Sequence, residues 1–290
     1  MTTPESQVRV ACLQMEPRIG DKERNVARSL AMIRDAAEAG ATLAVLPELC
    51  NTGYVFETRD EAFVLAETVP DGPTTQAWIQ AATDHDMTIV AGITEREGEA
   101  LYNSAVIVGP KGFVGRYRKN HLWGAENLFF EPGDLGVPVF HTGIGRIACA
   151  ICYDIWFPEV FRLAALQGAD ILCVPTNWVP MPQQPTTLPV MANILAMAGA
   201  HSNSMFVAAA DRIGEERGQP FLGNSIIVSH TGWPLAGPAS FDREEMIVAE
   251  INLADARRKR TLNEFNQLLR DRRTDVYAEM LGAQAKSGWY

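Results

Sequence analysis

A cysteine at the end of an apolar run is the strongest chemical signal in this 290-residue chain. Residues 146–151 have the composition of a buried strand, and Cys152 follows them directly. Pro158 and Glu159 then begin a helical pattern. A helix N-terminus favours the thiolate, which is the nucleophilic form of cysteine. Cys152 is therefore a candidate nucleophile, whereas most cysteines in apolar runs are structural.

Two further segments place an ionisable group at the end of a strand-like run. Glu48 follows the apolar residues 44–47, where a carboxylate is costly to bury unless it is paired or used. Lys119 follows residues 113–117, whose alternation predicts a half-buried strand. Taken alone, Glu48 also suits a surface turn, and the basic residues beside Lys119 suit a solvated edge strand.

Together these segments resemble the three signature segments of the nitrilase superfamily, the carbon–nitrogen hydrolases. Members of that family carry a Glu-Lys-Cys triad in this chain order. The matching stretches are Leu-Pro-Glu at 46–48 with Thr-Gly-Tyr at 52–54, Tyr-Arg-Lys-Asn-His-Leu at 117–122, and Cys-Tyr-Asp at 152–154 with Phe-Pro-Glu at 157–159. The resemblance spans residues 8–250 and implies that Glu48, Lys119 and Cys152 are catalytic.

A second glutamate follows the lysine in many members of the family, ahead of a Pro-Gly-Asp turn. Here Glu126 precedes such a turn at residues 132–134. The resemblance therefore implies that Glu126 orients Lys119 or the substrate. Glu131 lies closer to the turn and is the alternative.

The chemistry that the resemblance implies is hydrolysis through a covalent thioester. Cys152 attacks an amide carbon while Glu48 accepts the thiol proton. Lys119 and a backbone N–H near Tyr153 stabilise the oxyanion that forms. Ammonia then leaves, and water activated by Glu48 releases the acid. No cofactor or metal is implied, and the five histidines show no metal-ligand spacing.

Several aromatic and amide residues are expected to line the substrate pocket. The candidates are Tyr54, Trp123, Tyr153, Trp156, Asn177 and Trp178. Asn177 and Trp178 follow the predicted strand at 171–175 and should lie on the same rim as Cys152. Aromatic walls favour an apolar or flat acyl group.

The residues around the nucleophile favour one branch of the family over others. Nitrile-cleaving relatives commonly carry Cys-Trp-Glu, whereas this chain has Cys-Tyr-Asp. Carbamoylases often place an arginine soon after the nucleophile, where this chain has Ile155 and Trp156. An amidase for small primary carboxamides is therefore expected. N-carbamoyl hydrolase and nitrilase are the alternative enzymes. A catalytically silent scaffold protein is the alternative that is not an enzyme.

Composition excludes several other classes of partner. The formal net charge of −10 disfavours nucleic acid and anionic membranes. No apolar run is long enough to span a bilayer, and no secretory signal precedes the first strand. Five cysteines in mostly apolar runs suit free thiols in a reducing, cytoplasmic compartment. Cys149 and Cys152 have the Cys-x-x-Cys spacing of redox and zinc sites. A zinc site is not expected, because no second pair of Cys or His ligands lies at the required spacing.

Alternating strand and helix patterns predict an α/β fold. The resemblance implies more, namely a four-layer α-β-β-α sandwich of two mixed sheets in a single domain over residues 1–290. Strands are predicted at 8–13, 42–46, 88–92, 104–108, 113–117, 146–151, 171–174, 205–209, 223–228 and 246–251. Helices are predicted after an Asp21 cap, at 75–85, from Pro158 and at 187–202.

The C-terminal part of the chain is more strongly charged. Residues 257–273 alternate basic clusters with scattered apolar residues, which predicts a solvated surface helix. Related enzymes associate through a helical face and exchange C-terminal tails. The extension at about 253–290 is therefore expected to pack on a neighbouring subunit of a homodimer or higher homo-oligomer. Long loops at 124–137 and 179–189 are candidates for the rims of the pocket, and a plain surface excursion is the alternative for the second.

Overall fold

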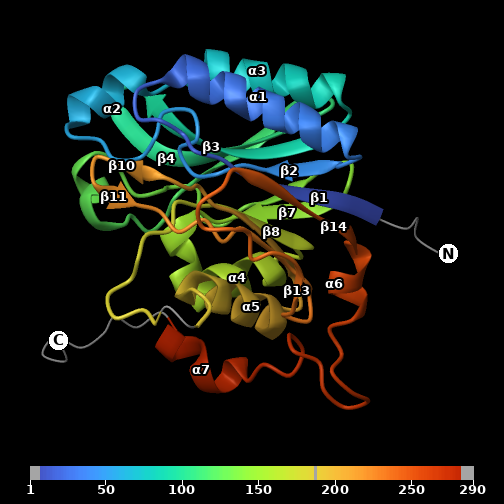
Figure 1. The fold of residues 1–290 in the computed structure, drawn as a ribbon. Helices are drawn as coiled ribbons and strands as arrows, with labels where there is room; N and C mark the ends of the chain where they lie inside the picture. Colours follow the sequence, from blue (N-terminus) through green and yellow to red (C-terminus); the bar gives the residue numbers. More distant parts are fainter. Residues whose placement is uncertain (1–6, 186–187, 282–290) are drawn as a thin grey trace, which may run out of the picture.

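The computed structural model describes residues 7–185 and 188–281 and contains two six-stranded sheets stacked between helices (Figure 1). The first sheet has the strand order β14-β1-β2-β3-β4-β5, and the second has the order β13-β12-β9-β8-β7-β6. In each sheet two parallel pairings at the centre are flanked by antiparallel ones. Both sheets are therefore mixed, and the predicted fold class is confirmed.

The strands of the two sheets alternate along the chain with the helices that cover them. The first sheet contains β1 (Gln7–Gln14), β2 (Leu43–Val45), β3 (Thr88–Glu97), β4 (Ala100–Gly109), β5 (Gly112–Arg118) and β14 (Glu245–Asn252). The second contains β6 (Val139–His141), β7 (Arg146–Cys149), β8 (Ile171–Pro175), β9 (Phe206–Ala210), β12 (Ile226–Val228) and β13 (Pro234–Ala236). A separate hairpin consists of β10 (Glu215–Glu216) and β11 (Gln219–Pro220).

Helices form the two outer layers. The helices are α1 (Lys22–Glu38), α2 (Arg59–Leu65), α3 (Pro73–Asp84), α4 (Pro158–Leu166), α5 (Met191–Asn203), α6 (Ala254–Arg258) and α7 (Thr274–Leu281). Figure 1 shows α1 and α3 over the outer face of the first sheet, and α4 and α5 over that of the second. Within the described ranges, no helix combines the length and the apolar character needed to cross a membrane.

Helix α1 shows where a hydrophobic pattern misplaces a buried face. Asp21 caps the helix as predicted, because its side chain accepts a hydrogen bond from the backbone N–H of Arg24. Of the four residues expected to form its apolar face, Ile33 is fully buried, whereas Val26, Leu30 and Ala37 are only half-buried and the polar residues Asn25 and Ser29 are fully buried. Ser29 Oγ accepts a hydrogen bond from the indole of Trp78. Satisfied polar groups thus occupy positions that hydropathy alone assigns to the surface.

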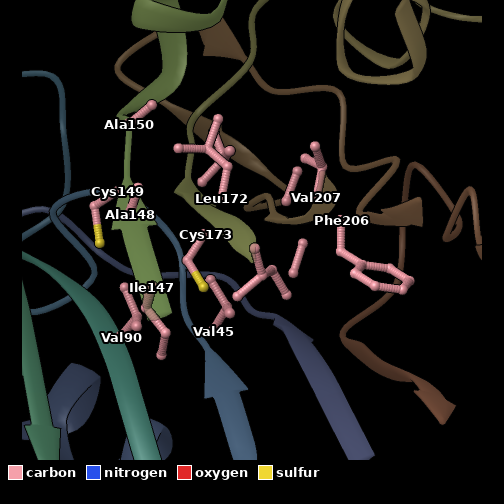
Figure 2. Packing of buried hydrophobic residues seen from close by; sticks show 14 of the residues in the cluster. Val45, Val90, Ile147, Ala148, Cys149, Ala150, Leu172, Cys173, Phe206 and Val207 are labelled. Atoms are coloured by element: carbon pink, nitrogen blue, oxygen red, sulfur yellow. The ribbon is translucent and has the colours of Figure 1, made fainter. Parts of the chain in front are cut away.

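The two sheets enclose the main hydrophobic core. Figure 2 shows Val45 and Val90 of the first sheet facing Ile147 and Cys173 of the second. The chain's five cysteines are all free and buried, as the composition predicted. Cys149 packs wholly inside this core, where burial raises the pKa of its thiol. Cys149 is therefore a packing residue, and the Cys-x-x-Cys spacing is not a disulfide.

Several predicted elements differ in their bounds from the observed ones. The strands expected at 88–92 and 104–108 are longer, as β3 and β4. The strand expected at 146–151 ends at Cys149, since the chain turns into a 3-10 helix at Cys152–Trp156. The helix expected at 187–202 begins at Met191, and residue 187 lies outside the described residues. The strand expected at 223–228 shortens to β12.

The basic strand β5 lies at a sheet edge, as expected of a solvated edge strand. Its basic side chains, however, are not all in solvent. Arg118 is 1% exposed. Its guanidinium pairs with Glu95 and Asp134 and lies 3.7 Å from the centre of the Tyr102 ring. The arginine is thus held by carboxylates on two sides and by an aromatic face.

The charged C-terminal region is not one continuous helix. Helix α6 is five residues long, and exposed Leu262 and Phe265 lie in turns before α7 begins at Thr274. The described part of the extension contacts its own chain, because Leu253 is fully buried in the main core. Packing on a neighbouring subunit stays a prediction.

Candidate active site

The turn after β2 buries Glu48 just beyond the carboxyl end of that strand. β2 ends at Val45, and Leu49 takes a left-handed conformation with φ of 45°. The neighbouring strand makes room for this turn at Gly92, where a Cβ atom would lie 2.4 Å from the Pro47 carbonyl oxygen and 2.5 Å from Glu48 Cα. Any larger residue at 92 would displace Glu48.

Glu48, Lys119 and Glu126 meet in one buried cluster. Lys119 Nζ donates to Glu48 Oε1 at 2.6 Å and to Glu126 Oε1 at 2.7 Å. Asn103 Nδ2, from the middle of β4, donates to the same Glu48 oxygen at 2.7 Å. The side chain of Glu131 is 52% exposed and pairs with Arg59. The structure therefore brings Glu126, rather than Glu131, to the lysine.

Cys152 begins the 3-10 helix in a left-handed conformation, with φ of 47°. Such a conformation is strained for a residue with a side chain, so surrounding contacts must hold it. Asp154 supplies them, because its Oδ2 accepts from the Ile151 N–H at 2.9 Å and from the Tyr117 hydroxyl at 2.7 Å. Its Oδ1 accepts from the His121 N–H at 3.0 Å. Asp154 thus joins the nucleophile turn to the segment that carries Lys119.

The surroundings of the Cys152 thiol favour its protonated form. Burial raises its pKa well above the ordinary value, and the nearby Glu48 carboxylate raises it further. Lys119, the Thr176 hydroxyl and the Asn177 backbone N–H act in the opposite direction without reversing the shift. A thiol in this condition needs a neighbouring base before it can attack.

Glu48 has the properties of such a base. Burial, assisted by the charge of Glu126, raises its pKa to about 7, against the opposing effects of Lys119 and Asn103. Its Oε2 atom is buried and accepts no hydrogen bond from the described protein groups. Burial alone would lower the pKa of Lys119, but the two carboxylates outweigh it and hold that pKa raised. The lysine therefore stays an ammonium beside a carboxylate that can gain or lose a proton.

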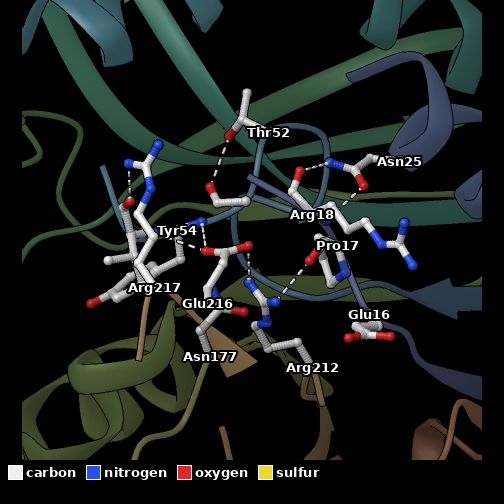
Figure 3. A network of polar contacts seen from close by, with 12 residues as sticks. Glu16, Pro17, Arg18, Asn25, Thr52, Tyr54, Asn177, Arg212, Glu216 and Arg217 are labelled. Carbon is white, nitrogen blue, oxygen red and sulfur yellow. Dashed lines mark hydrogen bonds and ion pairs between the residues drawn. The ribbon is translucent and has the colours of Figure 1, made fainter. Parts of the chain in front are cut away.

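A second polar network is centred on Glu216 and holds the loop of Tyr54 (Figure 3). Tyr54 donates its hydroxyl to Glu126 Oε1 at 2.6 Å. The backbone N–H groups of Tyr54 and Val55 donate to Glu216 Oε2 at 2.8 and 2.9 Å. Arg212, which is 1% exposed, donates to the other Glu216 oxygen at 2.8 Å. The β10–β11 hairpin thereby fixes the loop that presents Tyr54.

The predicted pocket residues lie around two adjacent cavities. The cavity at the nucleophile is lined by Trp123, Cys152, Tyr153, Trp156, Asn177, Trp178, Val179 and Met181. The second is lined by Tyr54, Val55, Phe56, Trp123, Gly124, Ala125, Glu126, Phe129, Val179 and Gln219. The loops expected at the rim supply members of both lists.

Two residues expected to bind substrate also hold the cluster. Tyr54 lies in the second cavity with its hydroxyl on Glu126. Asn177 lines the first cavity, but its Nδ2 donates to the Glu48 carbonyl at 3.0 Å. Asn103 and Asp154 also hold the cluster and were not among the predicted site residues. A polar residue within the apolar run of β4 was the available signal for Asn103.

The sequence profile of the carbon–nitrogen hydrolase family matches residues 9–261. The chain belongs to that family. It is therefore a hydrolase of carbon–nitrogen bonds other than peptide bonds. A protein called nitrilase from Pyrococcus abyssi is 45% identical over 93% of this chain and 99% of its own length. An N-carbamoylputrescine amidase of Solanum lycopersicum is 34% identical over 94% and 95% of the two chains.

Solved structures agree with the family assignment. A carbon–nitrogen hydrolase from Helicobacter pylori G27 superposes with a TM-score of 0.85 at 26% identity, over 96% of this chain and 99% of that one. A glutamate-to-glutamine mutant of the Nesterenkonia sp. AN1 amidase superposes with a TM-score of 0.77 at 26% identity, over 96% and 98% of the two chains. In that mutant, the acetamide moiety of fluoroacetamide is covalently added at the active-site cysteine.

The link between Glu216, Tyr54 and Glu126 can be tested with a double-mutant cycle. Tyr54→Phe removes a charge-assisted hydrogen bond to Glu126 and should lower kcat by about tenfold. Glu216→Gln should lower kcat less, and the double variant should resemble Tyr54→Phe because Glu216 acts through Tyr54. Glu61→Gln is the control, because Glu61 is a half-buried residue of α2 that pairs with Arg217 of the same hairpin. Additive effects in the cycle would contradict the link.

The pKa of Glu48 predicts a pH dependence for thiol reactivity. Since the carboxylate form accepts the proton, alkylation of Cys152 by iodoacetamide should accelerate as pH rises through about 7. Asn103→Ala removes a hydrogen bond that favours the carboxylate, so the midpoint should move to higher pH. Rates are followed by mass spectrometry of the Cys152 peptide. A midpoint unchanged by that variant would count against Glu48 as the base.

Proposed function

We propose that this hydrolase converts a small primary amide into a carboxylic acid and ammonia through a thioester on Cys152. The observation that carries the proposal is the buried Glu48–Lys119–Glu126 cluster beside a strained cysteine. A neutral thiol, an adjacent carboxylate with a pKa near neutrality and a fixed ammonium are the groups that acyl transfer from an amide requires.

In the first half-reaction, Glu48 accepts the thiol proton while Cys152 sulfur bonds to the amide carbon. Negative charge develops on the amide oxygen, and Lys119 with a backbone N–H near Tyr153 stabilises it. Glu48 then returns the proton to the amide nitrogen as the carbon–nitrogen bond breaks. Ammonia leaves, and the acyl group stays on sulfur.

In the second half-reaction, water replaces ammonia. Glu48 takes a proton from the water as the water oxygen bonds to the thioester carbon. The carbon–sulfur bond then breaks. The sulfur regains a proton, and the carboxylic acid leaves. Glu126 keeps Lys119 in place and is not consumed, because its oxygens are occupied by Lys119, Tyr54 and Asn103.

Nitrile hydrolysis is the second candidate, favoured by the 45% identity to the Pyrococcus abyssi protein called nitrilase. The Cys152 sulfur can add to a nitrile carbon while Glu48 transfers the thiol proton to the nitrile nitrogen, which gives a thioimidate. N-carbamoyl hydrolysis is the third, favoured by the carbamoylputrescine amidases. We prefer the amide to the nitrile because Tyr153 and Asp154 follow the nucleophile, as in the amidase and carbamoyl-hydrolase branches. We prefer it to the carbamoyl group because Ile155 and Trp156 stand where carbamoylases often have an arginine. The paired Glu48, Lys119 and Glu126 argue against a silent scaffold.

The five free thiols fit a reducing compartment, which we propose to be the cytoplasm. The net charge of −10 supports a small-molecule substrate rather than a nucleic acid or an anionic membrane surface.

Ammonia release from matched substrates tests the proposed reaction. The panel pairs aliphatic and aromatic amides with their nitriles and with N-carbamoyl compounds. Amides should release ammonia fastest, and Cys152→Ala should reduce release to background with the fold retained by circular dichroism. Cys149→Ala, the same change in the core three residues away, is the matched control. Faster release from nitriles or carbamoyl compounds would move the enzyme to another branch, and activity in Cys152→Ala would refute the thioester.

The oligomeric state is a separate prediction. We propose one domain, since a single hydrophobic cluster contains residues of both sheets, with an extension from about residue 253 that packs on a neighbouring subunit. Helix α4 leaves Leu163 and Leu166 48% and 45% exposed, as expected of a face that another subunit covers. Light scattering coupled to size exclusion should give at least a dimer, and Leu163→Glu should weaken it. A monomeric mass for the unmodified chain would contradict the proposal.

A further inference from the structure

We propose that the acyl group of the substrate is uncharged and extended, and that its tail occupies the second cavity. This inference rests on the proposed function for the reacting amide, and it adds the class of acyl group. Three features carry it, which are the sizes of the two cavities, their shared wall and the charges that line them.

The two cavities differ strongly in size. The one at Cys152 has a volume of about 20 Å³, room for little more than a single water molecule. The second has a volume of about 260 Å³. A group bound at the nucleophile therefore has space only for its reacting carbon and a small substituent. A longer acyl chain has to leave this cavity.

The residues shared by the two cavities show where such a chain can go. Trp123 and Val179 line both cavities and form the partition between them. Glu126 lines the second cavity and contacts Lys119, which in turn contacts Glu48. The second cavity thus adjoins the catalytic cluster, and a chain that passes the partition enters it.

The wall of the second cavity is suited to an apolar tail. Among the lining residues, Val55, Phe56 and Phe129 present apolar side chains, in addition to the partition. Glu126 is the one carboxylate among those described lining residues, and it is already bonded to Lys119 and Tyr54. No lysine or arginine stands among the lining residues that the structure describes. A charged tail would lose its hydration there without gaining a partner, which is unfavourable.

Gln219 provides a place to change the charge without touching the catalytic cluster. It lies on the hairpin at the edge of the second cavity, is half-buried, and donates its Nε2 to the adjacent Pro220 carbonyl at 2.9 Å. A charge introduced at Gln219 meets the substrate tail and leaves the partners of Glu48 and Lys119 in place.

The test compares three amides that differ at the tail. Hexanamide is neutral, adipamic acid carries a terminal carboxylate, and 5-aminopentanamide carries an ammonium where hexanamide has its methyl group. For the unmodified enzyme, kcat/KM should be at least about tenfold higher for hexanamide than for either ion. It should also rise about threefold per methylene from acetamide to hexanamide, as burial of an apolar tail requires.

Charge substitutions at Gln219 make the test specific to the second cavity. Gln219→Lys should improve adipamate relative to hexanamide by about threefold or more, and Gln219→Glu should do the same for 5-aminopentanamide. Gln76→Lys and Gln76→Glu introduce the same charges on the exposed surface of α3 and should leave these ratios unchanged. Equal kcat/KM for the three amides, or shifts produced equally by the Gln76 variants, would overturn the inference.

Binding separates this inference from the reaction. Protection of Cys152 from iodoacetamide reports occupancy whether or not turnover occurs. If amides are not hydrolysed but hexanamide protects Cys152 better than the two ions, the acyl-group inference holds and the proposed reaction fails. If amides are hydrolysed and all three protect equally, the reaction holds and the inference fails.

Discussion

The site depends on one buried ammonium held between two carboxylates. Lys119 is fully buried, and Glu48 and Glu126 bind it at 2.6 and 2.7 Å. An ion pair in such a place is stable only while every member is present, because removal of one leaves an uncompensated charge at a cost of roughly 3–5 kcal/mol. The surrounding polar groups of Asn103 and Tyr54 are therefore part of the same unit. They supply the hydrogen bonds that make burial of three charges tolerable.

The two-sheet architecture brings these groups together from distant parts of the chain. Glu48 follows β2 and Lys119 follows β5 in the first sheet, while Cys152 follows β7 in the second. The sheets share a core, so strand ends from both meet at one edge of the sandwich. Asp154 then fixes the remaining freedom, because it bonds both the turn of Cys152 and the segment of Lys119. The strands thus position the catalytic side chains, and the Asp154 carboxylate fixes the turn of Cys152 relative to the segment of Lys119.

The sequence predicted elements with strong local patterns and missed those that depend on tertiary contacts. The fold class, most strands and the convergence of Glu48, Lys119 and Glu126 were predictable, the last through the resemblance to known hydrolases. The burial of Asn25 and Ser29 on α1 was not, because these side chains have polar partners elsewhere in the chain. The hairpin β10–β11 was missed because two-residue strands have no periodicity to detect. Contacts such as Asn177 on the Glu48 backbone join residues far apart in sequence and leave no local pattern.

The same burial that makes the cluster costly also prepares its chemistry. With Lys119 charged, the cluster carries one positive charge and two potential negative charges, so the site holds an excess carboxylate. Burial and the charge of Glu126 raise the pKa of Glu48 to about 7, and the carboxylate and the acid then differ little in free energy near neutral pH. A group that must accept a proton, return it and accept another works best under that condition. A solvent-exposed glutamate would stay ionised and would accept the thiol proton only weakly, so the enclosed position of Glu48 is a requirement of its role.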